Sequence, residues 1–267
     1  ILQNMVYIGV VFPKVPGSKW RDINFRCLML HNRQCLMLRH YIESTAAFPE
    51  GTKYYFKYIH NQETRMSGDI SGIEIDLLSL PRLYYGGLAG EESFDSNIVL
   101  VTMPNRIPEC KSIVKFIASH AEHARAQSDG VLVTGEHTQL LAFENNNKTP
   151  ISINADGLYE VILQGVYTYP YHGDGVCGSI LLSRNLQRPI IGIHVAGTEG
   201  LHGFGVAEPL VHEMFTGKAI ESEREPYDRV YELPLRELDE SDIGLDTDLY
   251  PIGRVDAKLA HAQSPST

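Results

Sequence analysis

The sequence predicts an all-β protein with enough chain for two small domains or one large one. Many short apolar runs are separated by turns rich in glycine, proline and asparagine, which is typical of β-sandwiches and β-barrels. The 267 residues and the 43% apolar content are sufficient to fill the cores of two packed barrels. Composition alone does not choose between a sandwich and barrels.

The first half of the chain is predicted to form strands. Residues 24–30 and 34–38 flank a polar turn, His31-Asn32-Arg33, and this pattern predicts a β-hairpin. Residues 84–93 hold three glycines and two acidic residues, which predicts a loop. Further strands are predicted at residues 53–59, 70–80 and 98–103.

The second half begins after the proline-containing segment 104–108. Residues 111–119 carry apolar side chains at helical spacing, which predicts a short linking helix. Strands are predicted at residues 131–143 and 158–169, around a turn at 144–150, and at 206–210. We therefore divide the chain into a first strand region at 1–104, a linker at 105–128, a second strand region at 129–217 and a tail at 218–267.

The charge of the chain excludes a general nucleic-acid-binding surface. The formal net charge is −10, and residues 218–267 hold 12 acidic against 6 basic side chains. The longest apolar runs are too short for a transmembrane helix, so no membrane span is expected. The chain starts inside an apolar segment rather than with Met, which suits a piece excised from a longer polyprotein.

The four cysteines lack the spacing of a metal or redox site. They stand at positions 27, 35, 110 and 177, and no Cys-x-x-Cys pair occurs, so zinc and thioredoxin-type chemistry are not indicated and no cofactor is expected. We expect free thiols in a reducing host cytoplasm, because oxidation would block a nucleophilic cysteine.

Two glycine-rich segments carry the strongest chemical signal. The first, GVCGS from Gly175 to Ser179, places Cys177 between glycines just before an apolar run. Glycines let the backbone turn sharply there and direct its N–H groups toward whatever reacts at the sulfur. The second, from Gly192 to Gly197, is an apolar strand that holds His194. The ordered pair predicts an acyl-transfer nucleophile with an oxyanion hole made by the backbone of Gly175, Val176 and Cys177.

Together these segments resemble the C-terminal half of viral 3C-type cysteine proteases, the picornain family, from picorna-like viruses of the dicistrovirus or iflavirus kind. The resemblance implies a chymotrypsin-like fold of two antiparallel six-stranded β-barrels, an N-terminal and a C-terminal one, with the active site in the cleft between them. It also implies cleavage of viral polyprotein junction peptides after glutamine or glutamate.

A thiol needs a base, because its unperturbed pKa of about 8.5 leaves it mostly protonated at neutral pH. His40 follows an apolar strand in the first half, and its surroundings resemble the family's segment around the catalytic histidine. His60 is a rival, but it stands in a polar turn.

A third catalytic residue would orient the histidine base, and three residues are candidates for it. The family places an acid at the start of a strand like residues 98–103, where this chain has Asn97. Asp95 lies two residues earlier, on the same side of an extended strand, and we favour it. Asp76 follows His40 by a plausible interval but stands in an apolar run. Asn97 could also orient an imidazole.

In the family, a histidine on the strand after the nucleophile lines the S1 pocket, and His194 matches it. His172 stands where a threonine is usual, which is a departure from the pattern. Neutral rings would select glutamine, whereas a protonated pair would admit glutamate as the pH falls. Gly192 and Gly197 would leave room for an extended peptide to pair with a strand edge.

The tail and the linker carry weaker signals. Residues 245–255 resemble the opening of the RNA polymerase that follows the protease in such polyproteins, so a precursor with the adjacent polymerase is expected. The linker segment 111–115 matches the position of an RNA-binding segment in relatives, but its two lysines predict at most weak binding to viral RNA. An RNA-binding module and an inactive protease-like scaffold are the alternative functions.

Overall fold

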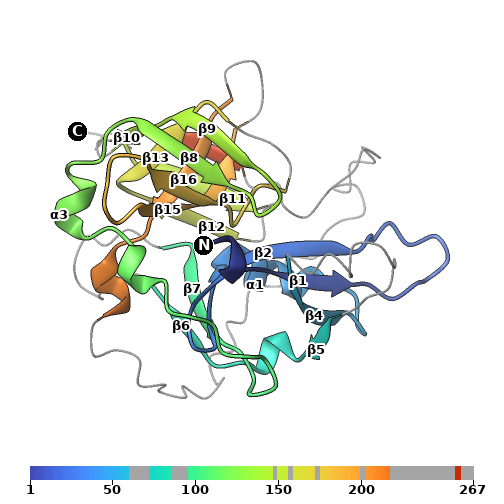
Figure 1. Ribbon diagram of the computed structural model, residues 1–267. Helices are drawn as coiled ribbons and strands as arrows, with labels where there is room; N and C mark the ends of the chain where they lie inside the picture. Colours follow the sequence, from blue (N-terminus) through green and yellow to red (C-terminus); the bar gives the residue numbers. More distant parts are fainter. Residues whose placement is uncertain are drawn as a thin grey trace, which may run out of the picture.

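The structure is a computed structural model that describes residues 1–59, 72–85, 96–146, 149–155, 159–171, 175–198, 203–216 and 256–259. Two antiparallel β-sheets, one from each half of the chain, form the body of the molecule (Figure 1). The all-β prediction is confirmed. Within the described residues, no helix is long and apolar enough to cross a membrane.

The first sheet has seven strands in the order β5-β4-β1-β2-β3-β7-β6. Its long strands are strongly apolar because both of their faces are largely covered. The predicted hairpin is present, and Asn32 in its turn adopts a left-handed backbone with φ of 49°. The strands are β1 (Met5–Val11), β2 (Ile23–His31), β3 (Gln34–Leu38), β4 (Lys53–Tyr58), β5 (Ile73–Ile75), β6 (Arg82–Tyr84) and β7 (Ile98–Thr102).

The second sheet has ten strands, and its main path runs β10-β13-β16-β15-β14-β8-β9. The hairpin of β11 and β12 and a strand from the tail, β17, lie beside this path, with β17 pairing to both β11 and β15. The strands are β8 (Asp129–Val133), β9 (Thr138–Ala142), β10 (Glu144–Asn146), β11 (Ile151–Ala155), β12 (Tyr159–Leu163), β13 (Val166–Tyr169), β14 (Ile180–Ser183), β15 (Ile190–Gly197), β16 (Gly205–Pro209) and β17 (Asp256–Leu259).

Three local predictions differ from the structure. The segment 131–143 is two strands, because Gly135 has a left-handed φ of 90° and reverses the chain between β8 and β9. The segment 158–169 is also two strands, since Gly165 turns the chain in the same way with φ of 69°. Within the part of the chain that the structure describes, the sheets hold seven and ten strands rather than six each.

The predicted linking helix is reduced to one turn. Residues 111–119 contain the 3-10 helix η4 (Val114–Phe116), and the α-helix α3 (His120–His123) begins one residue after that segment. Its N-terminus is closed by a capping box, in which Ser119 and Glu122 bond to each other's backbone N–H. The apolar residues of this segment are spaced as in a helix because Ile113 and Ile117 are both buried against the sheets. They do not belong to a continuous helix.

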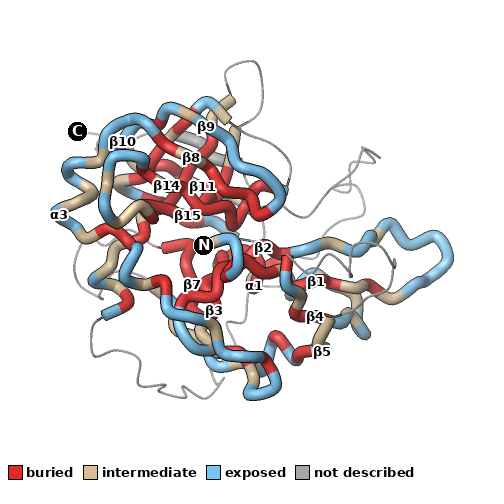
Figure 2. Tube along the Cα trace, viewed as in Figure 1, coloured by how far each residue is buried: buried red, intermediate tan, exposed pale blue. Residues whose placement is uncertain are grey.

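Buried side chains run continuously from one sheet to the other (Figure 2). The main hydrophobic core draws residues from both halves of the chain, and a smaller cluster lies within the second sheet. The linker is tied to the second sheet by the backbone N–H of Ala118, which donates to the carbonyl of Ile190 at 2.8 Å. The relative position of the two sheets is therefore set by packing and by backbone hydrogen bonds.

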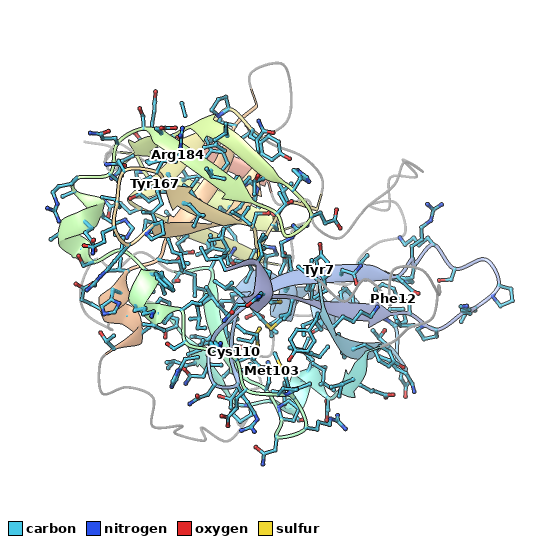
Figure 3. All side chains as sticks on the ribbon, viewed as in Figure 1. Tyr7, Phe12, Met103, Cys110, Tyr167 and Arg184 are labelled. Atoms are coloured by element: carbon cyan, nitrogen blue, oxygen red, sulfur yellow. The ribbon has the colours of Figure 1, made fainter. Side chains whose placement is uncertain are left out.

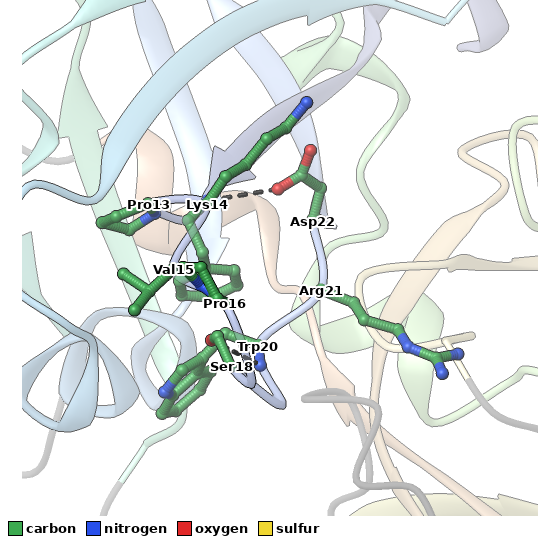
Figure 4. A pocket seen from close by; sticks show the side chains of 9 residues that line it. Pro13, Lys14, Val15, Pro16, Ser18, Trp20, Arg21 and Asp22 are labelled. Carbon is green, nitrogen blue, oxygen red and sulfur yellow. Dashed lines mark hydrogen bonds between the residues drawn. The ribbon is translucent and has the colours of Figure 1, made fainter.

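A hollow of about 580 Å³ lies at the far end of the first sheet, in the loop between β1 and β2 (Figure 4). Phe12 packs against Trp20 and Phe48 with ring centroids 4.9 and 5.1 Å apart. None of the sequence-predicted site residues lines this hollow.

Candidate active site

The segment around Cys177 forms a tight turn that only glycine permits at one position. Gly178 has a left-handed φ of 82°, and a Cβ built there would lie 2.1 Å from the carbonyl oxygen of Arg26. The N–H of Ser179 closes the turn by donating to the carbonyl of Val176 at 3.1 Å, and the Ser179 hydroxyl donates to the same oxygen at 2.6 Å. The turn is thus fixed both by glycine geometry and by its own hydrogen bonds.

Cys177 is buried, and its Sγ lies 3.5 Å from the carbonyl oxygen of Val195 on β15. Burial raises the pKa of the thiol to about 12, while the Arg26 guanidinium opposes that rise. In this state of the protein the sulfur is therefore protonated, and it needs a base to become a nucleophile.

His40 stands in the first turn of α1 (Arg39–Ser44), directly after β3. Its ring is buried, and burial lowers its pKa to about 3. Among the described residues, its Nε2 atom has no hydrogen-bond partner. A neutral imidazole with an available Nε2 is the type of group that accepts a proton in acyl transfer.

Asn97 holds both the backbone and the ring of His40. Its Oδ1 accepts the backbone N–H of His40 at 3.0 Å, and its Nδ2 lies 2.8 Å from the ring atom Nδ1. Because the amide oxygen is occupied by a backbone donor, the amide N–H₂ faces Nδ1, and the ring proton is placed on Nε2. Accepting a proton at Nε2 requires the other tautomer, so an acceptor must face Nδ1 during the reaction.

Glu208, on β16 of the second sheet, holds Asn97 in turn. Its carboxyl group accepts the backbone N–H of Asn97 at 2.9 Å and the hydroxyl of Ser96. Burial raises the pKa of this carboxyl to about 7, while the two hydrogen bonds oppose the rise. The second sheet thus fixes the segment that orients the histidine of the first.

We expect the pH dependence of stability to change when Glu208 is replaced by glutamine. A carboxyl whose folded pKa is raised from 4.5 to about 7 contributes stability that is fully present below pH 4.5 and is lost as the pH rises through 7. Glutamine does not titrate, so the wild-type free energy of unfolding should fall by about 2 kcal/mol relative to Glu208→Gln between pH 5.5 and 8. Urea unfolding at the two pH values measures this difference, and the exposed Glu50→Gln should show none; a pH-independent difference at Glu208 would contradict the prediction.

His194, in the middle of β15, forms a second buried site with Tyr169. The Tyr169 hydroxyl lies 2.6 Å from His194 Nδ1, and burial lowers the pKa of the ring to about 3. Gly205 makes room for the pair, since a Cβ there would lie 2.6 Å from the Tyr169 ring and 3.0 Å from the His194 ring. The Arg26 guanidinium and the His40 ring also lower the pKa of His194.

The structure joins the nucleophile segment to His194, because the N–H of Gly178 donates to the His194 carbonyl at 2.8 Å, and it brings Asn97 rather than a described carboxylate to His40. Asp76 is exposed, between β5 and the 3-10 helix η3 (Leu77–Ser79). Gly192 has no free edge for a peptide, because it pairs with Leu181 of β14 on one side and Pro209 of β16 on the other; that expectation was wrong. Asp95, His172 and His60 lie outside the described residues.

Sequence reasoning missed Arg26, Glu208 and Tyr169. Arg26 and Glu208 share a recognisable signal, because each is a charged residue inside an otherwise apolar strand and each is buried. A buried charge needs a partner, so such positions point to long-range polar contacts. Tyr169 carries no such signal, since tyrosine is common in strands.

Comparisons with known proteins found one sequence relative and several solved structures with a similar fold. No protein-family model matches the chain. It is 98% identical, over all of its 267 residues, to a segment of the genome polyprotein of Deformed wing virus, and it spans 9% of the length of that polyprotein.

Solved structures of viral proteases are also similar. The protease of tobacco vein mottling virus is 11% identical with a TM-score of 0.49, covering 83% of this chain and 84% of the other. The 3C protein of HRV-C with rupintrivir is 15% identical with a TM-score of 0.46, covering 78% and 93%. The chain is therefore similar over its whole length to a segment of a viral genome polyprotein, and its fold is all-β.

Proposed function

We propose that the chain is a cysteine endopeptidase that processes a viral polyprotein in the host cytoplasm, with Cys177 as nucleophile and His40 as base. The observation that carries the proposal is the nucleophile turn, which places a buried cysteine between glycines and donates a backbone hydrogen bond to the carbonyl of His194. The near identity to a polyprotein segment supports polyprotein junctions as substrates.

The chemistry starts from a neutral pair rather than a preformed ion pair. A thiol pKa near 12 keeps the proton on the Cys177 sulfur, and an imidazole pKa near 3 keeps His40 neutral before substrate binds. Once the single ring proton of His40 is on Nδ1, Nε2 accepts the Sγ proton while the sulfur attacks the peptide carbonyl, whose oxygen becomes an oxyanion facing the N–H groups of the turn. The imidazolium returns its proton to the leaving amine, and water hydrolyses the thioester by the same route.

His194 gives the site its preference for the residue before the cut. Burial raises the pKa of Tyr169 well above 10, so its hydroxyl stays protonated and donates to His194 Nδ1. The neutral ring then keeps its own proton on Nε2, where it can donate to the side-chain oxygen of a P1 glutamine. A carboxylate in this buried place would have no compensating charge on the ring.

Two strand edges beside the site can accept an extended peptide. In this structure β17 pairs antiparallel with β11 and meets Gly197 at the end of β15. This pairing supports the proposal that the same edges hold a substrate backbone, since a protease can bind an extended peptide as an added strand. Gly197 keeps its proposed role in peptide binding.

The domain boundaries and the polymerase start remain proposals. We place an N-terminal barrel at 1–104, the linker at 105–128, a C-terminal barrel at 129–217 and the tail at 218–267. Residues 245–255 lie outside the described residues, and a cut between the tail and the second barrel would release the polymerase.

Peptides that span the polyprotein junctions test the proposal. The purified protein is incubated with each peptide, and mass spectrometry locates the cut and so identifies P1. We propose that cuts follow glutamine or glutamate and that prior alkylation of Cys177 stops them. Binding of RNA without any peptide cleavage would contradict the protease proposal and support the RNA-binding alternative.

We expect glutamine to be preferred over glutamate at P1 by about 100-fold or more in kcat/KM, because a neutral donor is built into the pocket. With the His194 pKa near 3, the ratio should be the same at pH 8 and pH 6. Peptide pairs that differ only at P1 measure it.

Two variants sharpen that measurement. Tyr169→Phe removes the donor that fixes the His194 tautomer, so the Gln/Glu ratio should fall, whereas His172→Thr should change the ratio only if His172 lines the pocket. A Gln/Glu ratio of kcat/KM that falls as the pH drops would show that a histidine of the pocket is protonated. Efficient cleavage after leucine or phenylalanine would remove His194 from the pocket.

A further inference from the structure

Arg26 is a buried arginine of the first sheet that reaches across to the nucleophile turn of the second. It lies on β2 and is 8% exposed. Its Nη1 donates to the carbonyl of Gly175 at 2.6 Å and lies 3.3 Å from the carbonyl of Cys177. The same nitrogen lies 3.4 Å from the Ser179 hydroxyl. One guanidinium nitrogen therefore contacts both ends of the turn and the residue after it.

The carbonyls that Arg26 holds decide where the N–H groups of the turn point. In a trans peptide the C=O and the N–H of one unit point in opposite directions. When Arg26 fixes the Gly175 carbonyl, the N–H of Val176 faces away from Arg26. The Cys177 carbonyl is fixed likewise, and on the opposite side of that peptide the Gly178 N–H donates to the carbonyl of His194 at 2.8 Å.

Arg26 is itself held in place by Tyr7. Its Nη2 donates to the Tyr7 hydroxyl at 3.3 Å, and its guanidinium carbon lies 5.5 Å from the centroid of the Tyr7 ring. The Tyr7 hydroxyl donates onward to Glu136, in the turn between β8 and β9, at 3.3 Å. Tyr7 lies where the first sheet faces the second (Figure 3), so this chain of contacts joins the two sheets.

Arg26 is a buried cation that is linked to the Glu136 carboxylate through the Tyr7 hydroxyl rather than by an ion pair. Among the residues that the structure describes, no acidic side chain forms an ion pair with it, and its Nε has no hydrogen-bond partner. A buried cation without a counterion is costly. During the reaction a negative charge would develop first on the Cys177 sulfur and then on the substrate oxygen, and that charge would compensate the buried Arg26.

We propose that Arg26 is a positioning residue: it fixes the Gly175 carbonyl so that the backbone N–H of Val176 faces the substrate carbonyl, and its charge favours the attacking thiolate. The inference rests on the proposed protease function. Arginine suits both tasks, because its planar fork directs Nη1 to the two carbonyls and Nη2 to the Tyr7 hydroxyl, and the compact ammonium of lysine lacks two separated nitrogens. The charged form of Cys177 is favoured by Arg26, and the charged form of His194 is disfavoured by it.

The test compares Arg26→Met with the matched control Arg82→Met in the full chain. Arg82 lies in the same sheet, also buries its Nε, and donates to the carbonyl of Leu77, away from the turn. Two quantities are measured: kcat and KM for a junction peptide, and the pH midpoint of iodoacetamide labelling at Cys177, followed by mass spectrometry. Tyr41 and Tyr169 are the other titratable groups whose pKa values respond to Cys177, and both variants keep them.

For Arg26→Met we expect kcat to fall about 100-fold, with KM nearly unchanged, because oxyanion contacts are made only in the transition state. The labelling midpoint should rise by about one pH unit. Arg82→Met should change neither quantity. Arg26→Lys should restore the labelling midpoint but not kcat, since lysine keeps the positive charge but lacks the planar guanidinium that holds the turn.

Other outcomes overturn the inference. A parental kcat and midpoint in Arg26→Met would remove Arg26 from the mechanism, and an equal loss in Arg82→Met would show general destabilisation instead. If Arg26→Met does not fold, Tyr7→Phe removes the hydroxyl that holds Arg26, and it should lower kcat with the same direction of midpoint shift. Wild-type protein that cuts no peptide would refute the protease function, while the midpoint comparison would still decide whether Arg26 acts on Cys177.

Discussion

Replacing Cys177 with alanine is expected to abolish peptide cleavage, with a loss of at least about 10⁵-fold in kcat, because the attacking atom is removed. The fold should survive, since the change removes one sulfur atom from a turn that is closed by Ser179 and by the Gly178 backbone. Cleavage of a junction peptide and the melting temperature are measured together.

The matched control is Cys110→Ala, a partly buried cysteine at the Asn32 bridge between the hairpin and the linker. It should keep parental activity. Residual cleavage by Cys177→Ala at more than background would mean that another group is the nucleophile, and selective labelling of a different cysteine would identify it.

Replacing His40 with alanine is expected to lower kcat by about 10⁴-fold, because the base and its orientation are lost together. The thiol pKa near 12 makes this loss severe, since without a base almost no thiolate is available at neutral pH. Peptide cleavage at pH 7 and at pH 9.5 measures it. The variant should recover part of the rate at high pH, where hydroxide replaces the histidine, and a pH-independent loss would contradict a base role.

Three further variants test which residue orients His40. Asn97→Asp supplies a carboxylate that can accept both the His40 backbone N–H and the Nδ1 proton, so kcat should rise, by about tenfold or more, at pH 6.5. Glu208, with its pKa near 7, is largely neutral at that pH and does not oppose the new charge. Asn97→Ala should lower kcat. A larger loss in Asp95→Ala than in Asn97→Ala would make Asp95 the third member, and a loss in Asn97→Asp equal to that of Asn97→Ala would remove Asn97 from the role.

Local sequence patterns determined the fold class and the reactive segments. Alternating and continuous apolar runs between turn residues predicted the all-β class, and the hairpin around Asn32 followed from its polar turn. The glycines around Cys177 identified the nucleophile turn because a left-handed backbone and a close approach to Arg26 leave no room for any other residue at Gly178. These are properties of neighbouring residues, and a sequence displays them directly.

The tertiary structure decided which distant residues complete the site. Arg26 reaches a turn 149 residues away, and Glu208 holds a segment 111 residues away, so no local pattern contains either contact. The choice of Asn97 as the residue beside His40 likewise depends on how β7 pairs with β3, since Ile98 lies opposite Leu38 and places both neighbours together. The sequence predicted which groups react, and the packing of the two sheets decided which residues contact and orient those groups, because burial and strand pairing arise only when the chain is folded.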